Sequence, residues 1–178
     1  MMEYTDKYWK MIIPLVKKDL VRRFGKEEAA SLIQKTDVVY RDMLNRADDI
    51  GKDNPMASNL YEGLLFLALW EAADGKISVD DLREITRAVM QFPAMKLVGL
   101  FVNANRSGLE KLEKRMHKNA EWLEVHPQYK GVSWDFNFDK TKHSEGFYYH
   151  FTRCPLNDFA RREGYIEVLP VMCEIDLL

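Results

Sequence analysis

The most reactive side chains in this sequence are two thiols, Cys154 and Cys173. His150 precedes Cys154 by four residues, and in a regular strand both side chains would share one face with Asp135 of the neighbouring strand. A cysteine nucleophile needs a base or cation that raises its thiolate fraction, and a third polar group can orient that base. Thiol, imidazole and carboxylate in this order therefore indicate nucleophilic catalysis centred on Cys154.

The spacing of these residues sets a condition on that chemistry. Four residues span roughly 13 Å along an ideal strand, so a contact between His150 and Cys154 requires a bend or bulge near Thr152. The alternative is a buried and inert Cys154, because free cysteine is among the residue types most often buried. Both interpretations stay open on the sequence.

Cys173 has an acidic neighbour of its own. On a helix, Cys173 and Asp176 would lie on one face, and an acid between Ile175 and Leu177 requires either solvent or a buried donor. A zinc site made of both thiols, His150 and Asp176 is a second arrangement. The cysteine spacing matches neither a CxxC motif nor a disulfide scaffold, and we expect no metal and no cofactor.

Two other charged segments have structural explanations. Asp74-Gly75 resembles the turn of a calcium loop, but Gly75 at loop position six places Trp70 and Ala72 where carboxylates are required. A tight turn between two helices explains this segment better. The basic residues at 111–118, Arg115 among them, alternate with glutamates and indicate a solvated helix face rather than a nucleic-acid patch.

Composition excludes several classes of protein. The chain has 178 residues, 47% hydrophobic and 30% charged, which is typical of one globular domain spanning residues 1–178. A formal charge of −2 offers no field for nucleic acid or anionic lipid. Charged residues interrupt the first 24 positions, and the longest apolar stretch is far below the roughly 20 residues of a membrane span. We expect a cytoplasmic protein with a small-molecule substrate, and a homo-oligomer is a candidate assembly.

Hydrophobic periodicity predicts a helical part over residues 1–126. The stretch Leu60 to Ala73 is apolar nearly all round and is expected at the centre of a bundle. Ser78 followed by Asp81 predicts an N-cap with an acidic partner. The remaining predicted helices are Tyr8 to Arg23, Lys26 to Asp49, Val79 to Gln91, Ala94 to Asn103 and Leu109 to Glu124.

The period changes from helical to two after Pro127. Strands are predicted from Val132 to Phe138 and from Phe147 to Thr152, joined as a hairpin whose aromatic face packs on the helices. Helix is expected to return at Pro155 and to end before Gly164. A last apolar segment carries Cys173. The predicted fold class is α+β: a helical N-terminal bundle, then a β-hairpin and two C-terminal helices, with the thiols over residues 127–178.

The C-terminal segment reads HFTRCPLNDFARREGYIEVLPVMCEID over His150 to Asp176, and it resembles the signature of the L-2-amino-thiazoline-4-carboxylic acid hydrolase family. The matching positions are Thr152-Arg153-Cys154, Phe159, Glu163-Gly164, Leu169-Pro170, Cys173 and Asp176. The helical first two thirds are also similar to that family. In the family that this sequence resembles, the chain is expected to continue past the position of Leu178 with another strand-rich segment.

The resemblance implies a related fold and a hydrolase that opens a cyclic 2-amino-thiazoline carboxylate to N-carbamoyl-L-cysteine. The ring carbon between nitrogen and sulfur is electrophilic, so a thiolate can attack it or a carboxylate can activate water for the same addition. We expect a site centred on Cys154, with Cys173, Glu163, Asp176 and His150 as further catalytic residues. Arg153 is expected to clamp the substrate carboxylate.

The competing class is a non-catalytic relative, either a small-ligand binding module or a subunit of an oligomer that pairs through a sheet edge. The two classes differ in one structural expectation. An enzyme requires both thiols and at least one carboxylate at a pocket that solvent reaches, whereas an inert relative has Cys154 and Cys173 in aliphatic surroundings.

Overall fold

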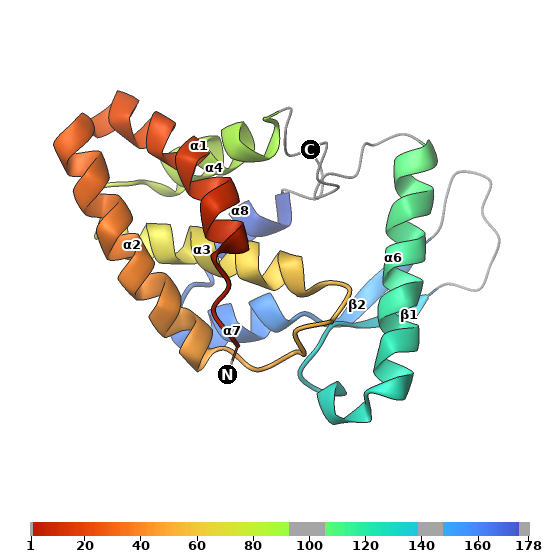
Figure 1. Cartoon of the computed structure of the whole chain (residues 1–178). Coiled ribbons are helices and arrows are strands. Elements are labelled where there is room, and N and C mark those ends of the chain that lie inside the picture. Colours follow the sequence, from red (N-terminus) through yellow and green to blue (C-terminus); the bar gives the residue numbers. More distant parts are fainter. Residues whose placement is uncertain (1, 93–105, 139–147, 175–178) are drawn as a thin grey trace.

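The structure consists of one buried helix, further helices on both of its sides, and a β-hairpin at one end. The computed structural model describes residues 2–92, 106–138 and 148–174 (Figure 1). Its elements in chain order are α1 (Asp6–Phe24), α2 (Lys26–Arg46), α3 (Ala57–Ala73), α4 (Val79–Met90), α6 (Arg106–Val125), a short 3-10 turn (Pro127–Tyr129), β1 (Asp135–Phe138), β2 (Tyr149–Arg153), α7 (Pro155–Glu163) and α8 (Leu169–Glu174). The predicted α+β class is confirmed.

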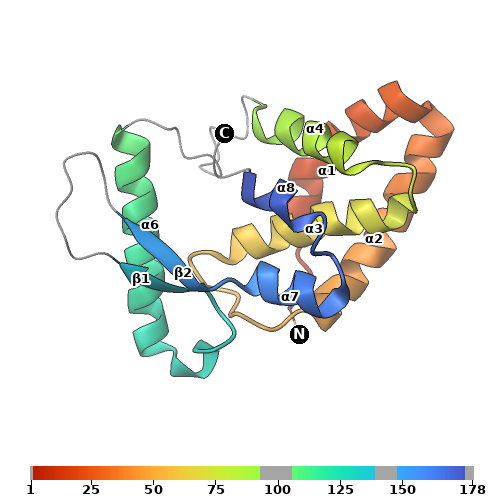
Figure 2. The same cartoon turned by 180° about the vertical axis from the view of Figure 1, so that it is seen from behind.

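The central helix is α3, as its composition predicts. Every residue from Leu64 to Leu69 is fully buried. Figures 1 and 2 show α1 and α2 on one side of α3 and α7 and α8 on the other. A helix surrounded in this way has little surface in contact with solvent, which explains why it is apolar nearly all round.

Local signals position the first helices as expected. The Ser78 hydroxyl accepts from the Asp81 amide at 3.1 Å, and the Asp81 carboxylate accepts from the Ser78 amide at 3.0 Å, so the predicted cap is a complete capping box. Gly25, with φ of 80°, separates α1 from α2. The predicted helix Ala94 to Asn103 lies outside the described residues. Among those residues, no helix combines the length and the apolar character that crossing a bilayer requires.

The hairpin is antiparallel, with Phe138 opposite Tyr149 and Phe136 opposite Phe151. Strand β1 begins three residues later than predicted, because the amides of Val132 and Ser133 donate to the Tyr129 carbonyl in a turn. The predicted aromatic face is present: the Phe136 and Phe151 rings lie 5.1 Å apart. The second predicted strand begins at Phe147, which lies outside the described residues.

Helix α6 packs across one face of the hairpin (Figures 1 and 2). Near its C-terminal end, Trp122 packs on Gly51 in the loop between α2 and α3. A Cβ atom at Gly51 would lie 2.6 Å from the Trp122 ring, and Gly51 has φ of 87°. Trp122 also stacks on Tyr129 at 5.2 Å. The Trp122 ring of α6 therefore packs directly on the backbone of Gly51.

Gly51→Ala is expected to lower the free energy of unfolding by about 2–4 kcal/mol, because a side chain there is strained at positive φ and overlaps a packed ring. Urea denaturation of the variant and the parent protein measures the difference. Gly131→Ala is the matched control: Gly131 has φ of 88° but open space around a new Cβ atom. An equal loss in both variants would contradict the role of the Trp122 contact.

Candidate active site

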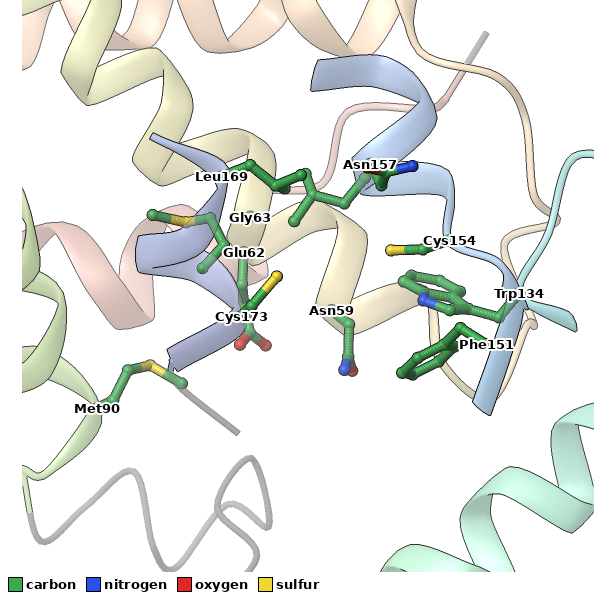
Figure 3. A pocket seen from close by; sticks show the side chains of 12 residues that line it. Asn59, Glu62, Gly63, Met90, Trp134, Phe151, Cys154, Asn157, Leu169 and Cys173 are labelled. Carbon is green, nitrogen blue, oxygen red and sulfur yellow. The ribbon is translucent and has the colours of Figure 1, made fainter. Parts of the chain in front are cut away.

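A cavity of about 400 Å³ opens where α3, α4, α7 and α8 meet the hairpin (Figure 3). Most of its lining is apolar, and a small number of polar groups interrupt it, as is typical of small-molecule sites. The side chains with polar or reactive atoms are Asn59, Glu62, Trp134, Cys154, Asn157 and Cys173. Both thiols and one carboxylate thus line the same cavity.

Cys154 reaches this cavity because the second strand is irregular. The pairing shifts between Asp135, which lies opposite Arg153, and Phe136, which lies opposite Phe151, so Thr152 is an extra residue in β2. The bulge falls at the position where a contact between His150 and Cys154 was expected to require one. The bulge does not bring His150 and Cys154 together. Instead, it places Cys154 on the same side of the hairpin as the aromatic ring of Phe151 and leaves His150 on the opposite side.

His150 is therefore not brought to Cys154. It lies opposite Asn137, is exposed, and does not line the cavity. The expectation that His150 and Cys154 share one face rested on regular alternation, and it is wrong because one inserted residue inverts the alternation beyond it.

The Cys154 thiol is half-buried at the residue that precedes α7. Burial raises the pKa of this thiol above its ordinary value. The amides of Asn157 and Leu156 and the side chain of Trp134 lower the pKa, but they do not outweigh desolvation. Cys154 is consequently a neutral thiol at pH 7, and it needs a base when it attacks a substrate.

Cys173 lines the cavity from α8 and is exposed. Helix α8 is tied to α4 by Arg83, whose Nε lies 2.8 Å from Oε2 of Glu174. Neither cysteine forms a disulfide. Figure 3 shows them on opposite sides of the cavity, with Asn59 in view between them. Both thiols therefore line one cavity, as the enzyme hypothesis requires.

Glu62 supplies the carboxylate, and sequence reasoning missed it. Its side chain lies on α3, the residue is only 8% exposed, and it lines the cavity near Cys173 (Figure 3). The apolar pattern of this helix predicted packing in the core and gave no indication of a site. A signal was nonetheless present in the sequence, because an acid on a helix that is apolar nearly all round requires a buried partner or a cavity.

The other predicted site residues are placed elsewhere or not described. Arg153 lies 2.7 Å from Asp158 in an ion pair and does not line the cavity. Glu163 accepts from Arg46 and Arg162 at the far end of α7. Asp176 lies outside the described residues.

The surroundings of Glu163 give it a structural role in the described part of the chain. Desolvation raises the pKa of this carboxyl, but Arg162 and Arg46 together outweigh that effect and hold the pKa below its ordinary value. The charged carboxylate thereby connects α7 to α2. Its distance from the cavity follows from the length of α7, because Cys154 precedes the first residue of that helix and Glu163 is its last.

The described residues also bear on metal binding. Among residues 2–92, 106–138 and 148–174, no three His, Cys, Asp or Glu side chains are grouped to hold a metal ion. The zinc arrangement of both thiols with His150 is not formed there, since His150 faces away from the cavity. The cavity offers thiol, carboxylate and amide groups, which suit nucleophilic addition and proton transfer.

Comparison with known proteins gives one match. Residues 58–177 match the model of the family described as L-2-amino-thiazoline-4-carboxylic acid hydrolase. Every residue that lines the cavity falls within this segment, whereas α1 and α2 precede it. No curated protein and no solved structure matches the chain.

Proposed function

The chain belongs to the L-2-amino-thiazoline-4-carboxylic acid hydrolase family, and on that premise we propose that it hydrolyses a cyclic amidine by opening its ring. The observation that carries this proposal is the shared cavity of Cys154, Cys173 and Glu62. Its volume of about 400 Å³ suits a small heterocycle. The favoured substrate is L-2-amino-thiazoline-4-carboxylate or a close relative.

Cys154 is the proposed nucleophile. Its proposed base is Glu62, which lies across the cavity near Cys173 and would act through a bridging water. A thiol whose pKa is raised by burial is protonated at rest, so its attack requires simultaneous proton removal. Among the described residues that line this cavity, Glu62 is the one with a carboxylate. A carboxylate in mostly apolar surroundings, away from bulk water, is suited to this transfer.

The proposed reaction proceeds in two additions. The Cys154 sulfur bonds to the ring carbon between nitrogen and sulfur while the thiol proton passes through a water molecule to Glu62, and the electron pair of the carbon–nitrogen double bond moves to the ring nitrogen. When this pair returns, the bond between the carbon and the ring sulfur breaks, and the departing sulfur takes the proton from Glu62. A thiol on the former ring and an adduct on Cys154 result.

Water completes the reaction by adding to the same carbon. Glu62 takes a proton from this water, the bond to Cys154 breaks, and the proton passes to the cysteine sulfur. One water is consumed, and N-carbamoyl-L-cysteine is released from the thiazoline. Cys173, on the opposite side of the cavity, contacts the substrate in this scheme.

Incubation of the full chain with L-2-amino-thiazoline-4-carboxylate tests the proposal. We expect a new thiol and a mass increase of one water in the product, measured by thiol titration and mass spectrometry. Binding of the ligand without either change would instead identify a non-catalytic ligand-binding relative. If the protein neither bound nor hydrolysed this ligand, the proposed substrate class would be refuted.

A further inference from the structure

We infer that Asn59 binds the carboxylate of the substrate through its amide nitrogen, and that Arg115 is the positioning residue that orients this amide. The inference rests on the proposed function, because it names how that substrate is recognised. It replaces Arg153 as the anchor expected from the sequence, since Arg153 is paired with Asp158 and lies outside the cavity.

The hydrogen bonds of Asn59 determine which way its carboxamide faces. Its Oδ1 accepts from Nη2 of Arg115 at 2.5 Å and from the Ser58 hydroxyl at 3.2 Å. A flipped amide would place its N–H groups against the N–H groups of Arg115, donor against donor. The acceptor is therefore used inside the protein, and Asn59 meets a ligand in the cavity as a hydrogen-bond donor.

Arg115 is held firmly enough to impose this orientation. Its Nη2 also donates to the Ser58 hydroxyl at 2.7 Å, and its Nε donates to the Pro55 carbonyl at 3.2 Å. These bonds connect α6 to the start of α3, and the planar guanidinium fixes their directions. The solvated face predicted for the basic residues of α6 is thus wrong for Arg115, which is half-buried between elements.

The charges near the cavity explain why such an arrangement is needed. Among the described residues that line the cavity, none is Lys or Arg, whereas Glu62 contributes a carboxylate one helical turn from Asn59. A substrate carboxylate would be repelled there without compensation. Burial raises the pKa of Tyr8; the Glu62 carboxylate adds to this rise and the Arg115 guanidinium opposes it, so both charges act electrostatically on the Tyr8 phenol.

Arg115 offsets that repulsion through Asn59. Its positive charge lies behind the amide and polarises it, so that the Nδ2 hydrogens favour an anionic acceptor. The same amide disfavours the positively charged amidine of the substrate. The geometry therefore directs the carboxylate to Asn59 and leaves the amidine carbon for the thiols, which is a prediction of substrate orientation.

Asn59→Asp tests the inference with minimal change in shape. The aspartate can still accept from Arg115 and Ser58, but it presents a carboxylate oxygen to the cavity in place of the amide donor. We expect Kd for L-2-amino-thiazoline-4-carboxylate to rise about 30-fold. Binding of 2-amino-2-thiazoline, which lacks the carboxylate, is expected to stay unchanged or become tighter. Titration calorimetry measures both in proteins that also carry Cys154→Ala, so that the ligands are not turned over during the titration.

Arg115→Gln and Arg115→Lys test the positioning role. Gln is expected to weaken binding of the carboxylated ligand about 10-fold with little effect on the ligand without a carboxylate, and Lys is expected to restore part of the loss. Lys114→Gln removes one positive charge from an exposed position of the same helix and is the matched control. Thermal melting of each variant separates these effects from loss of folding.

The outcomes separate this inference from the proposed function. Equal weakening of both ligands, or no weakening by Asn59→Asp, would overturn the inference while leaving ring opening intact. Binding without turnover by the parent protein would refute the hydrolase, and the comparison of ligands would still decide the role of Asn59. Failure of the parent protein to bind either ligand would overturn both.

Discussion

Glu62→Gln is expected to slow ring opening by at least about 100-fold, which is the usual contribution of a positioned general base. Gln has nearly the same size and keeps one acceptor, but it cannot take the proton of the Cys154 thiol or of water. Because the residue is only 8% exposed, the change removes a charge from a site shielded from solvent. Steady-state kinetics should show the loss in kcat rather than in KM.

Glu71→Gln is the control for this variant. Glu71 lies on the same helix, is exposed, and accepts from the Tyr165 hydroxyl rather than lining the cavity. Its activity is expected to match that of the parent protein. If Glu62→Gln retained activity within about threefold while its melting temperature was unchanged, Glu62 would not be the base.

Cys154→Ala is expected to abolish detectable turnover, because no adduct can form without the sulfur. Cys154→Ser keeps the size of the side chain and is expected to lose about 1,000-fold or more, since an alcohol is a far weaker nucleophile at neutral pH. Single-turnover mass spectrometry of the parent protein should capture an adduct on Cys154. If Cys154→Ala opened the ring as fast as the parent protein, direct addition of water to the ring carbon would be the remaining route.

The pH dependence follows from the raised pKa of Cys154. Below this pKa the thiol is neutral, so reactivity that depends on the free thiolate rises with pH and continues to rise above the ordinary value of about 9. Enzymatic turnover differs, because Glu62 removes the proton during attack. The turnover rate is therefore expected to level off at a lower pH than the rate of alkylation at Cys154.

Hydrophobic patterns sufficed for the fold because most elements are determined locally. The all-round apolar character of α3 predicted its central place, and Ser78 with Asp81 predicted the start of α4. The alternation around Phe136 predicted the hairpin. In each case, a single segment carries the information that determines its own conformation.

The cavity was harder to predict because it depends on contacts between distant segments. The bulge at Thr152 moves Cys154 to the other side of the hairpin, and a regular period of two contains no sign of it. Arg115 reaches Asn59 across 56 positions of sequence, so its apparent place on a solvated face was misleading. Both cysteines were identified by their chemistry, whereas Glu62 was hidden within an apolar pattern that packing already explained.

Ligand protection of the thiols tests most directly whether this cavity is the substrate site. Native Glu62→Gln, which is expected to open the ring at least about 100-fold more slowly than the parent protein, is treated with iodoacetamide, and each thiol is followed by peptide mass analysis. Without ligand, exposed Cys173 should react first, and Cys154 should react slowly and faster above about pH 9. Saturating L-2-amino-thiazoline-4-carboxylate should suppress both reactions, whereas unchanged alkylation of both thiols in the ligand-bound protein would show that the substrate does not bind in this cavity.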